Sequence, residues 1–214
     1  MLDIETLGTD PGAVILSIAA VEFDLESGKT GREYLWKIDI KDSMKHGFVI
    51  DPDTLLWWVG QNPEVFKSNI LPDGLTLPIK PVVEDIINVF KYALSPKIHV
   101  WGNSNRFDMG ILIPYLRVIT DKPIWKYSNE RDVRTLVSFN PFIKGEVVEK
   151  AKKDNLDLHN PIIDCKLQIE YCSKIYNSII TTAITVKNTA CGMLSSSITG
   201  LICDHCGLHR SEHI

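Results

Sequence analysis

The chain opens on the stretch Leu2-Asp3-Ile4-Glu5-Thr6-Leu7-Gly8-Thr9, which places two carboxylates on an apolar segment typical of a β-strand. Side chains two apart in a strand point to the same face, so Asp3 and Glu5 converge while Leu2 and Ile4 face the core. Neighbouring carboxylates repel each other unless a cation neutralises them, and hard divalent ions such as Mg²⁺ bind carboxylate oxygens. Asp-x-Glu alone is also typical of a solvated strand edge, so a metal site needs support from the rest of the chain.

Two further strands are expected next. Residues 13–23 form an apolar run and residues 33–39 alternate like an antiparallel partner, each bounded by turn residues. Only Met1 and Leu2 precede Asp3. Either the first strand is short on its upstream side, or the sequence begins inside a longer reading frame.

Helices and loops are expected over the middle and end of the chain. Residues 52–60 begin with acids and a proline, as helices do, and residues 131–136 continue into another short helix. The stretch 145–158 is charged and poorly periodic, which predicts a mobile loop with some helical content. From residue 178 the composition changes to Thr, Ser, Ala and Gly, which predicts a linker over 179–200.

Two more acids and a histidine stand where helices begin. Asp108 follows a short apolar strand and precedes an apolar helix, so it lies at a strand-to-helix corner. Asn160 and Pro161 are typical of a helix cap and first position, which leaves His159 on the preceding loop and Asp164 in the first turn, pointing inward. An acid at a helix start is often only a cap, and such a histidine is often only a surface residue.

Composition and charge exclude several classes of protein. The net charge of −4 argues against a broad basic surface for nucleic acid. No run of about 18 apolar residues and no signal-peptide pattern is present, so we expect a cytoplasmic protein without a membrane span. Five cysteines without a secretion signal favour free thiols or metal ligands over disulfides.

The order of these motifs resembles the His-containing (DnaQ-like, DEDDh) branch of the DEDD superfamily of 3′→5′ exonucleases. Asp3-Ile4-Glu5-Thr6 is similar to the first exonuclease motif, Asn105-Arg106-Phe107-Asp108 to the second, and His159 through Asp164 to the third. Three further segments resemble the phage and bacterial branch of Rv2179c-like exoribonucleases: Trp57-Trp58-x-x-Gln61, Trp101-Gly102-Asn103 and Arg134-Thr135.

This resemblance implies the fold class and the division of the chain. We expect an α/β fold with a ribonuclease H-like mixed sheet flanked by helices over residues 1–178. The linker 179–200 and a small Cys/His tail over residues 201–214 would follow.

The resemblance also implies two-metal-ion hydrolysis of phosphodiesters with Mg²⁺ or Mn²⁺, for which four acids provide ligands. In this scheme Asp3 bridges both ions, Glu5 and Asp164 complete the site of the nucleophile, and Asp108 anchors the other ion. Histidine ordinarily changes charge close to neutral pH, so His159 suits a general base that takes a proton from the attacking water.

An exonuclease must also hold a frayed single-stranded 3′ end of RNA or DNA, and stacking on aromatic or apolar side chains does so without sequence preference. Buried tryptophans are more often core than stacking platform, and a single arginine is more often a surface charge. The candidates for contact with substrate are Thr6, Leu7, Trp57, Trp58, Phe107 and Arg134.

The end of the chain holds a second metal-binding pattern, Cys203-x₂-Cys206-x₂-His209-x₃-His213. Two sulfurs and two imidazoles suit tetrahedral Zn²⁺, and Gly207 allows a tight turn around the ion. The gap between Cys206 and His209 is much shorter than in common zinc fingers. A structural zinc knuckle and a tail with incidental Cys and His therefore both stay open.

The leading function is a metal-dependent 3′→5′ exonuclease that releases nucleoside monophosphates from single-stranded ends. One alternative is a catalytically decayed nucleic-acid-binding module of the same fold, and another is a metal phosphohydrolase of small nucleotides. The motifs do not distinguish RNA from DNA, because that depends on contacts to the 2′-hydroxyl. The sequence leaves the oligomeric state open, although the resemblance to a superfamily with many dimeric members suggests a homodimer.

Overall fold

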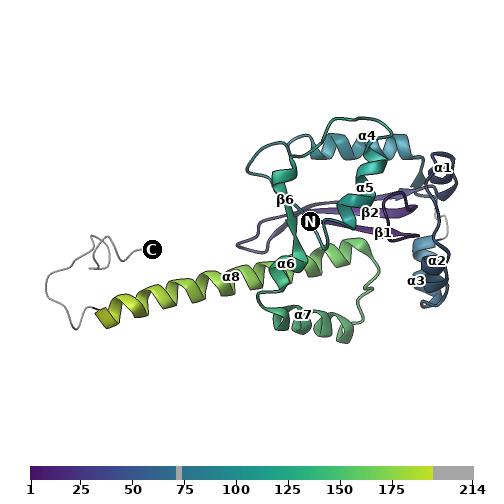
Figure 1. Ribbon diagram of the computed structural model, residues 1–214. Helices are drawn as coiled ribbons and strands as arrows, with labels where there is room; N and C mark the ends of the chain where they lie inside the picture. Colours follow the sequence, from purple (N-terminus) through teal and green to yellow (C-terminus); the bar gives the residue numbers. More distant parts are fainter. Residues whose placement is uncertain (71–73, 195–214) are drawn as a thin grey trace.

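The computed structural model describes residues 1–70 and 74–194 and places one mixed sheet between helices (Figure 1). Its strand order is β4-β3-β2-β1-β5-β6. β1, β2 and β3 are antiparallel neighbours, whereas β4 runs parallel to β3, β5 to β1, and β6 to β5. The strands are β1 (Leu2–Thr6), β2 (Ile15–Phe23), β3 (Thr30–Ile38), β4 (Thr76–Leu77), β5 (Val100–Gly102) and β6 (Glu130–Asp132).

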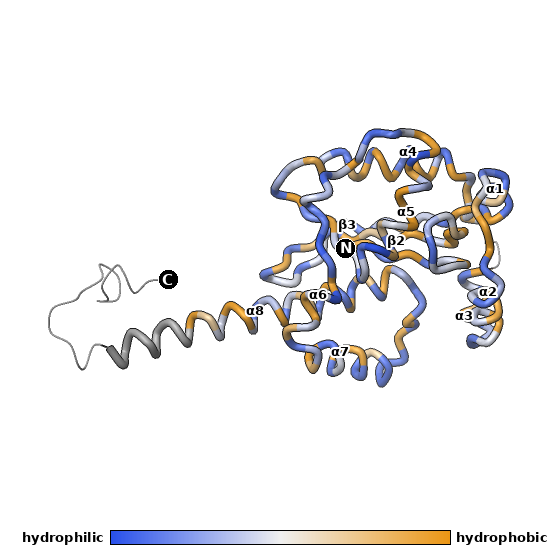
Figure 2. Tube along the Cα trace, viewed as in Figure 1, coloured by the Kyte–Doolittle hydropathy of each residue, from blue (hydrophilic) through white to orange (hydrophobic). Residues whose placement is uncertain are grey.

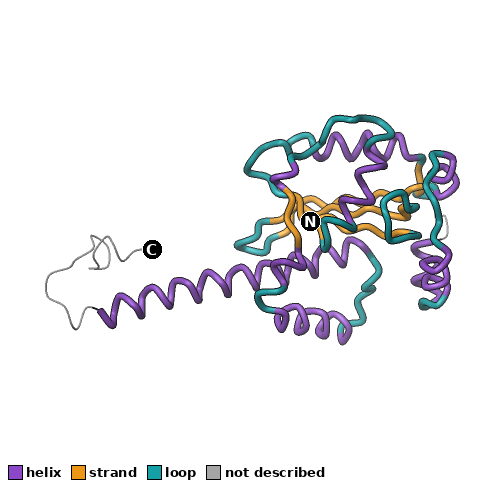
Figure 3. Tube along the Cα trace, viewed as in Figure 1, coloured by secondary structure: helices purple, strands orange, loops and turns teal. Residues whose placement is uncertain are grey.

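Helices cover both faces of this sheet (Figure 3). One face is covered by α4 (Ile79–Phe90) and α5 (Asp108–Leu116). The other is covered by α6 (Val133–Val137), α7 (Pro141–Lys153) and α8 (Pro161–Leu194). The segment between β3 and β4 forms α1 (Ile40–Lys45), α2 (Pro52–Val59) and α3 (Pro63–Ile70), and a 3₁₀ turn spans Tyr127–Asn129. The predicted α/β class, with a mixed sheet flanked by helices, is confirmed.

Alternation along β1 separates the core from the polar side of the site. Leu2 and Ile4 are buried in the cluster that includes α4 and α5. Asp3 pairs with Ala19 and Glu5 with Ser17 in the β1–β2 ladder, and Ala19 belongs to the cluster under α8. The two carboxylates therefore emerge on the face that α8 covers.

The stretch 145–158 was predicted to be a mobile loop with some helical content. It is regular helix as far as Lys153, so the prediction of a loop is wrong for most of the stretch. α7 begins with Pro141 at its first turn, buries Val147 and Ala151, and ends with a lysine-rich turn. Its apolar face packs on α8, and cations near a helix C-terminus interact favourably with the helix dipole. The helical periodicity of apolar residues was weak in this stretch because few residues of α7 are buried.

The expected helix over 131–136 begins later, since residues up to Asp132 pair with β5 as β6. Asp132 caps α6, because its side chain accepts a hydrogen bond from the backbone N–H of Thr135 at 2.8 Å.

The change of composition at residue 178 does not end α8, which continues to Leu194 and projects away from the rest of the chain (Figure 1). No glycine or proline interrupts residues 162–191, so the helix has no break there. The projecting part carries exposed Ile179, Ile180 and Ile184, which continue the apolar colouring along α8 (Figure 2). The expected division at 178 thus falls inside a helix. Among the described residues, no helix is long and apolar enough to cross a membrane.

Candidate active site

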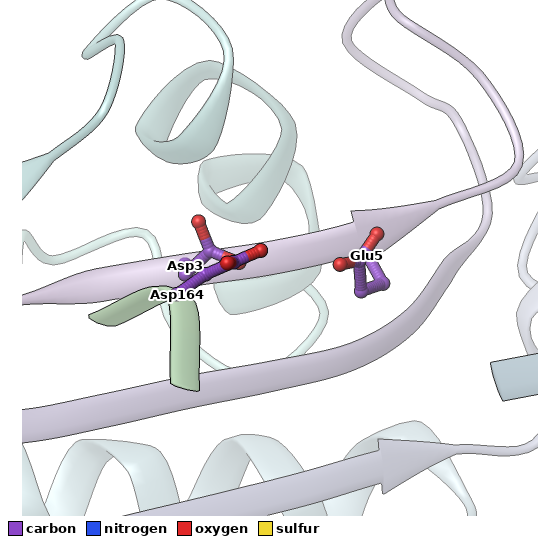
Figure 4. A group of neighbouring side chains, drawn as sticks. All are labelled: Asp3, Glu5 and Asp164. Atoms are coloured by element: carbon purple, nitrogen blue, oxygen red, sulfur yellow. The ribbon is translucent and has the colours of Figure 1, made fainter. Parts of the chain in front are cut away.

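Three of the predicted metal ligands meet where β1 passes the start of α8. Asp3 and Glu5 come from the strand and Asp164 from the first turn of the helix (Figure 4). Each offers a carboxylate oxygen, and these oxygens lie within 4.8 Å of one another. The structure thus places side by side three acids that the sequence carries on a strand and on a distant helix.

Asn160 positions Asp164 by capping α8. Its side-chain oxygen accepts a hydrogen bond from the backbone N–H of Ile162 at 3.1 Å, and its carbonyl oxygen accepts from the N–H of Asp164 at 2.9 Å. A cap of this kind fixes where the helix starts, and therefore the direction in which the first-turn carboxylate points.

Asp108 lies beside this trio rather than within it. Its side chain is 2% exposed at the start of α5, and Oδ2 accepts a hydrogen bond from the backbone N–H of Ser104 at 2.8 Å. A Cβ on Gly102 would lie 3.0 Å from that oxygen, so the glycine leaves space for the carboxylate. A small cavity of about 120 Å³ is lined by both Asp108 and Asp3, and by the side chain of Arg134.

Burial raises the pKa values of all four acids, and repulsion between members of the cluster adds to this effect for Asp3 and Glu5. Burial, then Asp108 and Asp164, raise the pKa of Asp3 well above its usual range. Burial, and next the charge of Asp3, raise the pKa of Glu5 to about 9. Burial is also the main cause that raises the pKa of Asp164 to about 7 and that of Asp108 to about 6. Without a cation, the cluster therefore retains protons that acids at the surface would lose.

The donor set fits divalent cations that prefer oxygen. Three carboxylates converge without a described lysine or arginine among them, and carboxylate oxygens are the ligands that Mg²⁺ and Mn²⁺ take in proteins. A bound cation would stabilise the ionised carboxylates and so lower these pKa values.

The ring of His159, on the loop before α8, packs against two aromatic side chains of α2. Its centroid lies 5.4 Å from the ring of Trp57 and 5.9 Å from that of Trp58, both edge to face. Its backbone N–H donates to Asp157 Oδ1 at 3.1 Å. The imidazole lines the same cleft as the carboxylates of Asp3, Glu5 and Asp164.

This cleft measures about 660 Å³. Of the predicted substrate contacts, Thr6, Trp57, Trp58 and Phe107 line it, and Arg134 lines the small cavity beside it. Neither lysine nor arginine is among the described residues that line the larger cleft. Another hollow, of about 600 Å³, lies near Phe23 and Trp101 and contains none of the predicted site residues.

The tryptophans differ in what they can offer a substrate. Trp57 is 48% exposed, whereas Trp58 is 1% exposed and its indole N–H donates to the carbonyl of Thr6 at 2.8 Å. Trp58 therefore joins α2 to the end of β1. Leu7 is also 1% exposed in the core, so contact with a substrate would require it to leave that core.

Two features of the site were missed from the sequence. Gln168 hydrogen-bonds Asp3 across 165 positions of chain, and the tryptophans contact His159 across about a hundred. The position of Gln168 four residues after Asp164 puts both on one helix face, which is the signal that could have found it. The predicted zinc ligands Cys203, Cys206, His209 and His213 lie outside the described residues.

Comparison with known proteins identifies the family. Residues 1–176 match the family model of the 3′-5′ exoribonuclease Rv2179c-like domain. No curated protein sequence matches the chain.

Two solved structures of exonuclease I share the fold. One, described as suggesting how processivity is achieved, has 18% sequence identity and a TM-score of 0.52. The other, E. coli exonuclease I in complex with a 5cy-dT13 oligonucleotide, has 17% identity and a TM-score of 0.55. Each alignment covers 84% of this chain and 42% of exonuclease I, so the chain spans less than half the length of those proteins. At this identity the likeness shows the fold alone, whereas the family match covers most of the chain: the chain belongs to the Rv2179c-like family of 3′→5′ exoribonuclease domains.

Proposed function

We propose that the chain hydrolyses the terminal phosphodiester at the 3′ end of single-stranded nucleic acid and releases a nucleoside 5′-monophosphate. The observation that carries this proposal is the convergence of Asp3, Glu5 and Asp164 within 4.8 Å, in the cleft that His159 also lines.

Asp3, Glu5, Asp108 and Asp164 would hold two Mg²⁺ or Mn²⁺ ions. Such ions supply an activated water near neutral pH and neutralise charge that develops on the attacking and leaving oxygens. The contribution of the chain is a set of buried and half-buried carboxylates on two rigid elements, β1 and α8, with Asp108 at the start of α5. Rigid elements keep the ligands in place without reorganisation during the reaction.

His159 is the proposed general base. Its imidazole takes a proton from the water molecule whose oxygen forms a bond to the terminal phosphorus. The bond between phosphorus and the 3′-oxygen of the penultimate nucleotide then breaks, and that oxygen takes a proton from solvent. Packing against Trp57 and Trp58 keeps the imidazole oriented toward the cleft, so that the side chain does not have to change rotamer before the proton transfer.

The cleft offers features that suit a single-stranded end. Its exposed aromatic side chain, Trp57, offers a face for stacking a base, which is worth about 1–3 kcal/mol per base. Because carboxylates and no described lysine or arginine line the cleft, the grip on phosphate would come mainly from the bound cations and from Arg134 in the adjoining cavity. The family description favours RNA, and the exonuclease I complex contains a DNA oligonucleotide.

A catalytically decayed binding module is the alternative with the same fold. Four acids and a histidine in reactive positions argue against decay, because unused carboxylates this close together only cost stability. The predicted homodimer also remains a proposal, which the mass of the protein in solution would test.

The test uses matched single-stranded RNA and DNA of one sequence, labelled at the 5′ end, with Mn²⁺, Mg²⁺ or a chelator. The proposal expects a ladder that shortens from the 3′ end with metal, and an intact strand with chelator. Binding without shortening in both metals would support the decayed module instead. Faster hydrolysis of a nitrophenyl ester of a nucleotide than of either polymer would favour a phosphohydrolase of small nucleotides. Comparison of the RNA and DNA ladders gives the preferred sugar.

A further inference from the structure

Gln168 connects the two elements that carry the candidate metal ligands. It lies one turn after Asp164 on α8, and its Nε2 donates a hydrogen bond of 2.8 Å to Oδ1 of Asp3 on β1. The side chain is 5% exposed. One face of α8 therefore supplies both a carboxylate of the cluster and a hydrogen-bond donor to another carboxylate of the cluster.

The bond to Asp3 fixes which way the amide of Gln168 points. Its other polar atom, Oε1, is buried and has no hydrogen-bond partner among the described residues. When Asp3 is ionised, as a ligand of a cation must be, the reversed amide would place that oxygen against the carboxylate, and two acceptors at hydrogen-bond distance repel each other. Only the orientation with Nε2 toward Asp3 satisfies the buried carboxylate.

The chemistry of the donor suits a neighbour of a metal ligand. A carboxylate has about four acceptor positions, so one bond from Gln168 to Oδ1 leaves Oδ2 and part of Oδ1 free for a cation. A lysine or arginine in the same place would add a positive charge that repels the cation. An uncharged amide holds the carboxylate without that competition.

We propose that Gln168 is a positioning residue that holds the Asp3 carboxylate in the orientation in which it binds the divalent cation. The proposal rests on the metal site of the proposed function. Partners that orient a ligand commonly contribute 10–100-fold to metal affinity, because without them the ligand must be ordered when the ion binds. Loss of the amide should therefore weaken the cation site by about 10-fold or more.

A purely structural role for Gln168, as an attachment of α8 to the sheet, predicts a different result. The same helix offers a matched control in Asn177, whose Nδ2 donates to the backbone carbonyl of Glu26 at 2.8 Å. This is also a carboxamide that attaches α8 to another element, here the turn between β2 and β3, but Asn177 does not line the cleft. Its replacement loosens this attachment of α8 without removing a hydrogen bond to any carboxylate of the cluster.

The experiment measures Mn²⁺ binding by calorimetry, without substrate, for the wild type and for Gln168→Met, Gln168→Asn and Asn177→Leu. Methionine keeps the size of the side chain and removes the donor, whereas asparagine keeps the amide and is one methylene too short. We expect both Gln168 variants to raise the dissociation constant for Mn²⁺ by about 10-fold or more, and Asn177→Leu to leave it within about twofold. Circular dichroism shows which variants fold, and if the methionine variant fails to fold, the asparagine variant decides.

Each outcome separates this inference from the proposed function. If the wild type binds no Mn²⁺, the metal site of the proposed function is wrong, and the role of Gln168 falls with it. If the wild type binds Mn²⁺ and the folded Gln168 variants bind equally tightly, the positioning role is overturned while the proposed function stands. An equal loss in Asn177→Leu would also overturn it, because general loosening of α8 would then be the cause.

Discussion

Replacement of Asp108 by asparagine should make the metal-free protein more stable and the enzyme inactive. Burial raises the pKa of Asp108 from its ordinary 3.8 to about 6, which means that folding opposes ionisation of this carboxyl. Each unit of pKa corresponds to about 1.4 kcal/mol, so the charge costs the folded state up to about 3 kcal/mol above pH 7. The asparagine oxygen can still accept the hydrogen bond from the Ser104 N–H.

The sign of the pH dependence follows from the raised pKa. At about pH 3, below the ordinary pKa of 3.8, the carboxyl is mostly protonated in the folded and unfolded states, so wild type and Asp108→Asn should have nearly equal stability. As the pH rises from about 4 through about 6, the unfolded state loses its proton first, and the wild type loses stability that the variant keeps. Above about pH 7 the difference should level off.

Urea denaturation in the presence of a chelator, at about pH 3 and at pH 8, measures this difference. We expect Asp108→Asn to be about 1–3 kcal/mol more stable at pH 8 and nearly unchanged at about pH 3. Saturating Mn²⁺ should stabilise the wild type more than the variant, because the cation binds a site with one more charged ligand. A variant less stable than the wild type at pH 8, or a difference equal at both pH values, would refute the argument that a buried charge imposes the cost.

Three other predictions concern the histidine, the tryptophan and the tail. His159→Ala should lose about 10²–10⁴-fold in kcat with KM nearly unchanged, as steady-state kinetics on a single strand would show; a rise confined to KM would make it a substrate contact. Trp58→Phe should lower the unfolding free energy, measured by urea denaturation, by about 0.5–1.5 kcal/mol, because the hydrogen bond to Thr6 is lost. An unchanged unfolding free energy would show that this bond does not stabilise the fold. If the tail binds zinc, purified protein should contain about one equivalent that disappears when Cys203 and Cys206 become serine, and less than half an equivalent, unaffected by these changes, would leave the tail without the knuckle.

Much of the fold could be predicted because its signals are local. Alternation along residues 2–6 identified a strand with acids on one face, and Pro52 after an acid identified the start of α2. Short or marginal elements gave no such signal. α7 buries only two residues, and β6 pairs over three, so tertiary packing rather than local pattern determines both.

The site was predictable as far as its residue types and their order, but not in its supporting contacts. Carboxylates at fixed spacings on a strand and a helix start can be read from the chain, because each spacing has a geometric meaning. The bond from Gln168 to Asp3 and the packing of Trp58 on His159 join segments far apart in sequence. The spacing from Asp164 indicates that Gln168 faces the site, but no local rule identifies Asp3 as its partner or Trp58 as the neighbour of His159. The burial of Leu7 was not predictable either: its position next to the acids suggested contact with the substrate, whereas the structure places its side chain in the core.

The central claim is that the carboxylates around Asp3 drive cleavage from the 3′ end, and the product of one turnover tests it most directly. A single strand labelled in its last nucleotide is mixed with excess enzyme and Mn²⁺, and the released label is identified over time for the wild type and for Asp3→Asn. The account predicts that the label appears from the first time point as nucleoside 5′-monophosphate with the wild type, and stays on the strand with the variant or with chelator. Label released first in longer fragments, or released equally by Asp3→Asn, would contradict it.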